Sequence, residues 1–312
     1  MKTSKLITSK KRLLTTASLF TLCTPMMAFA GEGNFGWLYT LDIQPKGKFE
    51  FEQRIDHTTG QATGTYELTT LRSEVEYGLS NDVQIAAYLN STRIHASKNY
   101  INPDVCSNGT PCTAGFGVSS EYNDGGNTFD RWDAIDGFSG EIIWRILNPL
   151  TSPVGVGIYI EPTIGKLQDS LEFKLITQSN FLDDKLILAT NLSYEIEKEH
   201  YTDGDDNIIR QSHVDLNYGA SYHFADNWSA GLEGRLHNDF AGYQLQHHIQ
   251  FANFIGPNIH YGAKDFWVTA AWRYQTHGLC YGEGTGDCNA VTGKVSDDHG
   301  RNQFIVKVGV PF

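Results

Sequence analysis

Apolar side chains recur at every second position along most of the chain between residues 47 and 312. Because successive side chains of a β-strand point to opposite faces, this pattern predicts strands with one apolar and one polar face. It yields about twelve strands, many of roughly the 9–11 residues that a tilted membrane strand needs. In the clearest of them, Phe49, Phe51 and Ile55 share one face, and charged residues occupy the other. Five later segments repeat the arrangement, and their apolar faces begin at Val83, Val154, Leu186, Val214 and Phe266.

The connections between these strands alternate in length. Short turns are expected at 80–82, 183–184, 225–227 and 263–265, and longer polar loops at 94–128, 198–208 and 277–300. Short turns on one side and long loops on the other are typical of transmembrane β-barrels, and an even strand number brings both ends of the barrel to the side of the turns. A soluble β-sandwich also joins many short strands by turns, but it does not require this alternation.

The last strand, residues 304–312, also alternates. Phe304, Val306, Val308, Val310 and Phe312 would form one apolar face. This strand resembles the terminal recognition strand of Gram-negative outer-membrane β-barrels, and the resemblance implies that the barrel-assembly machinery recognises Phe312. No stretch after residue 30 has the roughly 18 uninterrupted apolar residues of a membrane helix, so a chain that spans a bilayer must do so as a closed barrel.

We therefore predict an all-β fold, a transmembrane antiparallel up-and-down barrel of about 12 strands. The expected location is the outer membrane of a Gram-negative cell, with short turns in the periplasm and longer loops outside. The expected surroundings are outer-membrane lipid and lipopolysaccharide.

Residues 1–30 have the pattern of a cleavable secretory signal peptide. Five basic residues end at Arg12, an apolar stretch runs from Leu13 to Met27, and Ala28-Phe29-Ala30 forms a small-x-small cleavage site. Hydroxyl residues and a proline interrupt the apolar stretch, which is too short to span a bilayer. The mature chain is expected to begin near residue 31.

The charge of the mature chain argues against nucleic acid as a partner. The full sequence has 24 basic and 36 acidic residues, and the signal peptide contains five of the basic and none of the acidic ones. The remaining 19 basic residues against 36 acidic ones give a net charge of −17. Such a chain would repel phosphate backbones.

The polar faces of the strands would gather charged side chains in the lumen of the barrel. These groups either pair across strands and hold a narrow or blocked barrel together, or line a pathway that selects a solute. With their surplus of carboxylates, an open lumen should prefer cations. The lumen and selectivity candidates are Glu50, Glu52, Arg54, Arg72, Glu74, Glu76, Glu141, Arg145, Glu161, Glu233, Arg235 and Arg273.

Residues 31–46 precede the barrel, which is expected to span 47–312. They include six large apolar or aromatic residues, too many for a free tail. A barrel of this strand number leaves room for a small solute unless something fills it. Residues 31–46 would therefore plug the lumen, lie as a tail on the periplasmic surface, or pair as a further strand.

Four cysteines remain in the mature chain, in two close pairs. Cys106 and Cys112 share one long loop, and Cys280 and Cys288 share another. In an oxidising compartment this spacing indicates two local disulfides, with cross-pairing between the loops as the alternative. Neither pair has the C-x-x-C spacing of a zinc site. We expect neither a metal nor another cofactor.

Histidines are the candidate catalytic groups of this chain. His237 and Asp239 lie near a predicted strand end, where a histidine could act as a base or a metal ligand. We expect these two side chains to be solvated residues at the polar rim of the barrel, because no nucleophile motif accompanies them. The protein is therefore not expected to be an enzyme, and an outer-membrane hydrolase is the third choice. Histidines expected to face the lumen are His213, His223 and His260.

Residues 39–52, YTLDIQPKGKFEFE, lead through a Pro-x-Gly turn into the acidic first strand. This segment resembles the start of a group of outer-membrane transporters that includes the MetA-pathway phenol-degradation-like proteins. The resemblance implies a barrel with a solute-transport role and transfers no binding residue. We expect a channel or transporter for passive passage of a small hydrophilic or amphipathic solute. The alternative is a closed structural or surface-interaction barrel that acts through its disulfide-stapled outer loops.

Overall fold

A computed structural model describes residues 33–60, 65–97, 129–200, 209–281 and 300–312. The signal peptide and three of the four paired cysteines, Cys106, Cys112 and Cys288, lie outside these residues. Cys280 lies at the end of the eleventh strand. The cleavage site and the cysteine pairing therefore stay predictions. Among the residues that the structure describes, no helix is long and apolar enough to cross a membrane.

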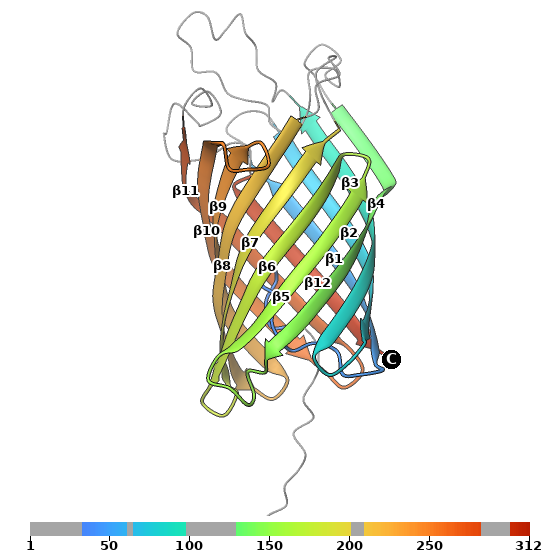
Figure 1. The fold of residues 1–312 in the computed structure, drawn as a ribbon, viewed down its shortest axis with the longest axis vertical. Helices are drawn as coiled ribbons and strands as arrows, with labels where there is room; N and C mark the ends of the chain where they lie inside the picture. Colours follow the sequence, from blue (N-terminus) through green and yellow to red (C-terminus); the bar gives the residue numbers. More distant parts are fainter. Residues whose placement is uncertain (1–32, 61–64, 98–128, 201–208, 282–299) are drawn as a thin grey trace, which may run out of the picture.

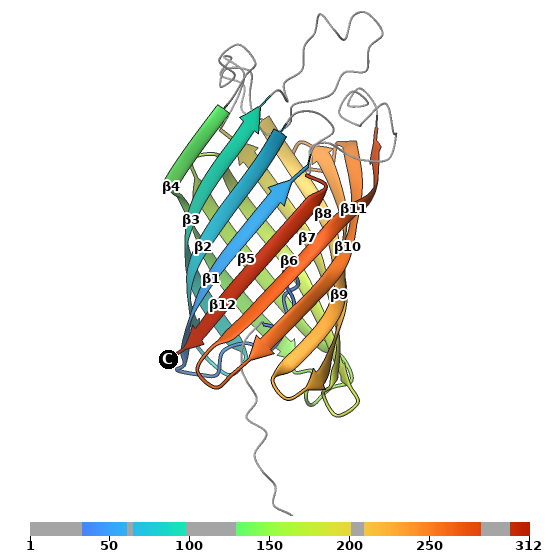
Figure 2. The same ribbon diagram turned by 180° about the vertical axis from the view of Figure 1, so that it is seen from behind.

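Twelve antiparallel strands form a closed barrel, in agreement with the predicted fold (Figures 1 and 2). Each strand pairs with the next in sequence, and β12 pairs with β1 to close the sheet. The strands are β1 (Phe49–Thr59), β2 (Thr65–Gly78), β3 (Val83–Ser97), β4 (Phe129–Leu147), β5 (Gly155–Gly165), β6 (Gln168–Phe181), β7 (Leu186–Glu199), β8 (Ile209–Ala225), β9 (Trp228–Ala241), β10 (His247–Gly262), β11 (Trp267–Cys280) and β12 (Asn302–Pro311).

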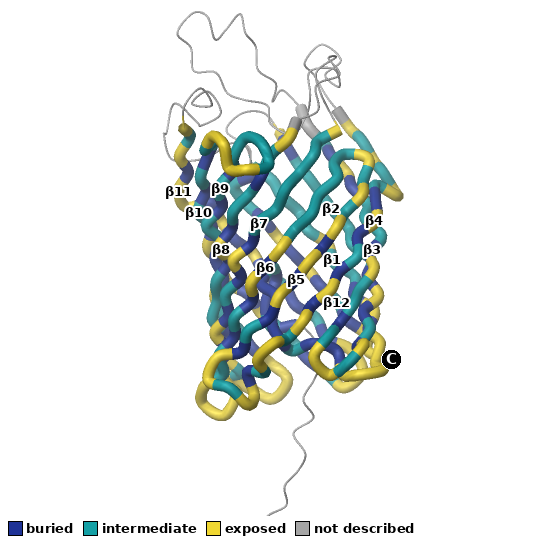
Figure 3. The backbone as a smooth tube through the Cα atoms, in the orientation of Figure 1, coloured by how far each residue is buried: buried dark blue, intermediate teal, exposed yellow. Residues whose placement is uncertain are grey.

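The exterior of the barrel is apolar and its interior is polar. Exposed and buried positions alternate along the strands (Figure 3). On β5, Ile158 and Ile160 are exposed on the outside, whereas Tyr159 between them is completely buried inside. This is the reverse of a soluble protein, and it is the arrangement of a barrel whose outer face meets lipid.

The two ends of the barrel differ. We call the end with the connections β2–β3, β4–β5, β6–β7, β8–β9 and β10–β11 the turn end, and the opposite end the loop end. Residues 182–184 and Asn227 adopt positive φ in two of the tight turns. The predicted loops begin too early, since β3 continues to Ser97 and β11 to Cys280. At the loop end, β5 and β6 are joined by only residues 166–167, so the outer connections are not uniformly long.

Residues 33–46 lie inside the barrel rather than beside it (Figures 1 and 2). They enter at the turn end, rise to Trp37 and return to the turn end. Two buried apolar clusters form where they meet the wall. One joins Tyr39, Leu41 and Ile43 to the wall residues Ile143, Tyr159 and Ile176, and the other joins Phe35 and Leu38 to Ile187 and Ala189. The apolar core of the turn-end half is thus built between this inner segment and the strands.

Candidate functional site in the barrel lumen

Amide side chains of the wall hold the backbone of the inner segment, residues 33–46. Asn191 accepts a hydrogen bond from the Tyr39 N–H at 2.7 Å and donates one to the Tyr39 carbonyl at 2.9 Å. Gln178 accepts from the Leu41 N–H at 2.6 Å. Asn191 and Gln178 are at most 1% exposed. Because buried backbone groups need partners, these amides replace the neighbouring strand that the segment lacks.

The same pattern continues toward both ends of the segment. One carboxylate, that of Glu233, accepts from the Gly36 and Trp37 N–H groups at 2.8 and 2.9 Å. Gln84 accepts from the Gln44 N–H at 2.7 Å. The segment is therefore fixed to β3, β6, β7 and β9 by side chain to backbone hydrogen bonds.

Glycines of the wall make room for the apolar side chains of the segment. A Cβ on Gly157 would lie 2.5 Å from Leu41 Cδ2, and one on Gly219 would lie 2.8 Å from Phe35 Cε1. At the turn end, a Cβ on Gly78 would lie 2.1 Å from the Pro45 carbonyl oxygen. Real Cβ contacts of this length essentially never occur. Glycine at these positions thus permits the close approach of the segment to the wall.

Asp42 is the acidic residue of the inner segment. Gln178 Nε2 donates a hydrogen bond to its carboxylate at 3.2 Å. Burial raises the pKa of Asp42, whereas this hydrogen bond and the charge of Arg145 act in the opposite direction. Arg145 also donates to the Leu41 carbonyl at 3.0 Å.

The twelve lumen candidates lie on the inner faces of the strands, but they belong to two levels. Glu50, Glu52, Glu74, Glu76 and Glu141 are buried beside the inner segment in the turn-end half. Some of them have direct partners: Lys307 lies 3.2 Å from Glu52, Trp267 donates to Glu50 at 3.0 Å, and Gln44 donates to Glu76 at 3.0 Å. Arg145, Glu233 and Arg273 contact the segment itself.

The other candidates form ion pairs nearer the loop end. Arg54 lies 2.6 Å from Asp56, and Arg235 lies 2.6 Å from Asp215. Arg72 of β2 pairs with Glu161 of β5, three strands away, and its guanidinium lies 4.2 Å from the centre of the Tyr88 ring. Most of the predicted charges therefore have a partner within the wall.

Two cavities lie on the loop-end side of the inner segment, and both have Thr70 and Arg72 in their walls. The smaller one, of about 260 Å³, is lined by Arg54, Arg72 and Arg273 together with Asp56 and Trp37. The larger one, of about 360 Å³, is lined by Glu161, Glu172 and Glu195 and by several amide and hydroxyl side chains. Trp37, the highest point of the inner segment, donates to Asp56 at 2.9 Å and stacks on Arg273 at 4.1 Å.

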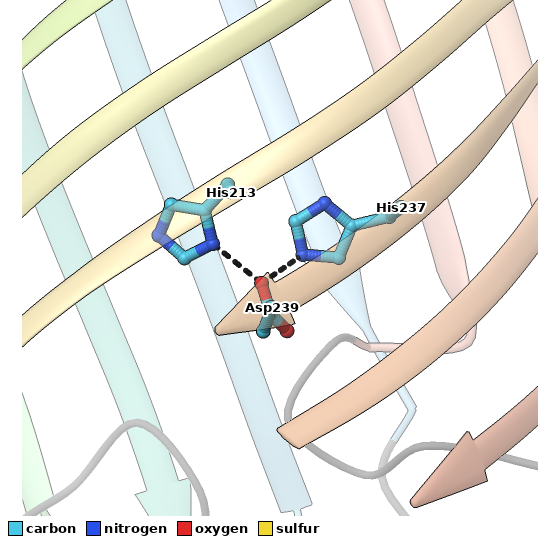
Figure 4. Close-up of side chains that lie close together, drawn as sticks. All are labelled: His213, His237 and Asp239. Carbon is cyan, nitrogen blue, oxygen red and sulfur yellow. Dashed lines mark hydrogen bonds and ion pairs between the residues drawn. The ribbon is translucent and has the colours of Figure 1, made fainter. Parts of the chain in front are cut away.

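Among the residues that the structure describes, one group has the geometry of a metal site. Ligand atoms of His213, His237 and Asp239 lie within 4.8 Å of one another (Figure 4). The sequence placed His213 in the lumen and His237 and Asp239 near a strand end, but it did not bring them together. Strand periodicity places all three side chains on the lumen face, but a bulge between His223 and Ala225 shifts the register that the turn alone would give. The pairing of His213 with Asp239 therefore could not be predicted from the turn.

The wall amides Gln84, Gln178 and Asn191 are functional contacts that sequence reasoning missed. Only Gln84 lies between two apolar residues, whereas Gln178 lies between Thr177 and Ser179, and no feature of the sequence marks the three amides as partners of the inner segment.

A family model described as a family of unknown function (DUF6662) matches residues 27–312. No curated protein matches the chain. The chain is similar in structure to the COG4313 outer membrane channel from Pseudomonas putida F1, with a TM-score of 0.55 and 8% identity over 86% of this chain and 97% of that chain. This likeness is one of fold, and the specific resemblance to the MetA-pathway group stays a prediction.

Two further solved structures have lower TM-scores. The NanC porin gives a TM-score of 0.48 and 12% identity over 83% of this chain and 98% of that chain. The translocator domain of the autotransporter NalP from Neisseria meningitidis gives 0.48 and 13% over 87% and 91%.

Proposed function

We propose that this chain, which belongs to the DUF6662 family of unknown function, is an outer-membrane channel for passive passage of a small hydrophilic or amphipathic solute. The proposal rests on two cavities, each lined in part by charged side chains, in the loop-end half of a closed barrel with an apolar exterior. The channel from Pseudomonas putida, which has the same fold, supports it. Export by a cleaved signal peptide, contact with lipopolysaccharide, and assembly through the strand that ends at Phe312 are parts of the same proposal.

Residues 33–46 act as a plug in this proposal. They fill the turn-end half, so a solute that enters the cavities from the loop end can pass to the turn end only when the segment moves aside. The β1–β12 pairing closes the barrel without the segment, and its removal leaves all twelve strands paired. Release of the segment costs its hydrogen bonds and its apolar contacts but does not require any two strands to separate.

The cavity walls favour a solute that has both polar and apolar groups. The three arginines of the smaller cavity can bind oxygen atoms, and the Trp37 ring offers an apolar surface beside them. For simple ions we expect cation preference once the plug has moved, because the turn-end half contains the carboxylates of Glu50, Glu74, Glu76 and Glu141.

Conductance in planar bilayers tests the proposal. The mature chain should give rare steps, whereas a variant lacking residues 33–44 should give frequent, larger steps with cation preference in a salt gradient. A second variant, in which a Gly-Ser sequence of equal length replaces residues 33–44, separates loss of contacts from loss of length. Silence from both variants would contradict the channel, provided that their mobility on gels remains heat-modifiable and the barrels are therefore folded.

The alternative function is a closed barrel that acts through its outer loops, and the dense hydrogen bonding of the inner segment favours it. A reversible lock distinguishes the two. With Gln44→Cys and Gln84→Cys, a disulfide would tie the segment to β3. Under the channel proposal oxidation stops conductance and reduction restores it, whereas a permanently closed barrel is silent in both states.

A further inference from the structure

We propose that His213, His237 and Asp239 bind a divalent transition-metal ion on the lumen wall. The register of β8 and β9 makes the site. His213 lies opposite Asp239, and Asp215 lies opposite His237. Because residues two apart on a strand share a face, all four side chains point into the barrel at the same level.

Two imidazole nitrogens and one carboxylate oxygen meet at one point (Figure 4). His213 Nδ1 and His237 Nε2 each lie 2.5 Å from the same oxygen, Oδ1 of Asp239. Two histidines and a carboxylate are a recurrent ligand set for Zn²⁺ and for other first-row divalent ions. A slight separation of the three groups would place an ion between them at bond lengths of about 2.0–2.2 Å.

The outward nitrogens of both histidines face further carboxylates. His237 Nδ1 lies 2.5 Å from Asp215 Oδ1, and His213 Nε2 lies 3.5 Å from Glu197 Oε2. Histidines that bind metals usually donate their other N–H to such a carboxylate, which fixes the ring and leaves the inner nitrogen as the ligand. Arg235 holds Asp215 in turn at 2.6 Å.

The charges around the site favour a cation. Three acidic side chains surround the two histidines, those of Glu197, Asp215 and Asp239. A fourth, Glu195, lies opposite His213 on β7. The basic residue of the group is Arg235. On the β10 side, Asp239 and His237 face the neutral residues Gln250 and Ala252. With neutral imidazoles, the acidic side chains outnumber the basic one. A divalent ion would offset this excess, and such compensation matters because the side chains of His237 and Asp239 are only 3% exposed.

Access to the site is from the lumen. The side chain of His213 retains 15% exposure. The site lies on β8 and β9 toward the loop end, so binding does not depend on release of the inner segment and can be tested apart from conductance.

The test is titration of the full mature chain, purified in detergent without a polyhistidine tag, with ZnCl₂ in a calorimeter. We expect one tight site per chain. His237→Gln and Asp239→Asn should weaken it by at least about tenfold, and Asp215→Asn by about 10–100-fold, the usual effect of losing an outer carboxylate. The matched control is His223→Gln, which lies on the same β8 but outside the group, and it should bind zinc as the parent does.

Absorption spectroscopy of the unmodified chain with Co²⁺ tests the proposal even if a variant does not fold. Co²⁺ should give the intense visible absorption of a low-coordinate nitrogen and oxygen site, and an equimolar amount of Zn²⁺ should remove it. Absence of a tight zinc site in the folded parent would overturn the proposal. Equal zinc affinity in His237→Gln and His223→Gln would overturn it as well, because binding would then involve other histidines.

Discussion

The two halves of the lumen are made by the same twelve strands but are filled in different ways. In the turn-end half, apolar side chains of residues 33–46 pack on aliphatic and glycine positions, and wall amides and the Glu233 carboxylate hold the backbone. Several other glutamates are buried beside the segment. In the loop-end half, ion pairs between strands surround two cavities. One strand therefore contacts the inner segment near its turn end and contributes to an ion pair near its loop end. On β5, Gly157 receives Leu41, whereas Glu161, four residues further, pairs with Arg72.

This difference has an energetic consequence. A segment that buries Phe35 and Leu41 completely gains from apolar burial and closes its half of the barrel. Charged groups in the other half keep water beside them unless they are fully paired, and a hydrated cavity can admit a solute. The inner segment thus fills the turn-end half, and the two cavities lie in the loop-end half.

The largest effect is expected from breaking an ion pair of the loop-end half. Arg72→Met removes the ion-pair partner of Glu161, whose side chain is only 7% exposed and retains hydrogen bonds from Tyr159 and Thr163. Loss of one partner of a buried pair costs about 3–5 kcal/mol, and the partial exposure of Arg72, 18%, places the expected loss near the lower value. Urea unfolding in lipid vesicles, followed by tryptophan fluorescence, measures it.

Arg93→Met is the control for that loss. Arg93 pairs with Asp130 at 3.4 Å, but both side chains are at least half exposed. Exposed pairs contribute about 0–1 kcal/mol, so this variant should unfold almost as the parent does. Equal losses in the two variants would show that the Arg72 pair does not support the wall.

The next effect concerns the fit of the inner segment. Gly157→Val places a Cβ within 2.5 Å of Leu41 Cδ2, and overpacking of this kind costs about 1–3 kcal/mol. We expect the segment to leave the lumen, so that chymotrypsin cleaves it at its aromatic residues and conductance steps become frequent. Gly140→Val is the control, because its Cβ faces outward with the Ala86 carbonyl oxygen 3.9 Å away. Resistance of the Gly157→Val segment to chymotrypsin would refute this account of the fit.

A smaller effect should follow from loss of one wall amide. Asn191→Leu removes both hydrogen bonds to Tyr39, at about 0.5–1.5 kcal/mol each. The two bonds together contribute about 1–3 kcal/mol, and 1.4 kcal/mol corresponds to a factor of ten. The released population should therefore rise by at least about fivefold, as read from the rate of chymotrypsin cleavage. Asn238→Leu loses a hydrogen bond to the Val214 carbonyl on the outer face and should leave this rate unchanged.

The sequence predicted the fold well because strand periodicity is a local signal. The alternation placed Ile158 and Ile160 outside the barrel and the twelve charged candidates inside it, without any knowledge of which strands pair. Loop boundaries were less accurate, since polar residues at the ends of β3 and β11 continue the strands beyond the membrane-facing pattern.

The contacts within the lumen could not be predicted in the same way. Tyr39 and Asn191 are 152 residues apart, and only the closed barrel brings them together. An amide that binds the inner segment and an amide that faces water have the same pattern in sequence. The His213, His237 and Asp239 group lies between these cases, because a predicted hairpin turn joins its two strands but a bulge between His223 and Ala225 shifts their register.

The smallest effect that we predict is on ion preference. Its measurement shows which half of the lumen determines the selectivity between cations and anions. Glu50 lies opposite Glu76 and Glu52 lies opposite Glu74, so four carboxylates face the same narrow part of the wall. Replacing all four by Gln retains their size and one acceptor oxygen each but removes the negative charge. Measured in the variant lacking residues 33–44, so that the pathway is open, the reversal potential in a salt gradient should move toward zero. An unchanged reversal potential would place selection in the loop-end half, where Arg54, Arg72 and Arg273 face the solute first.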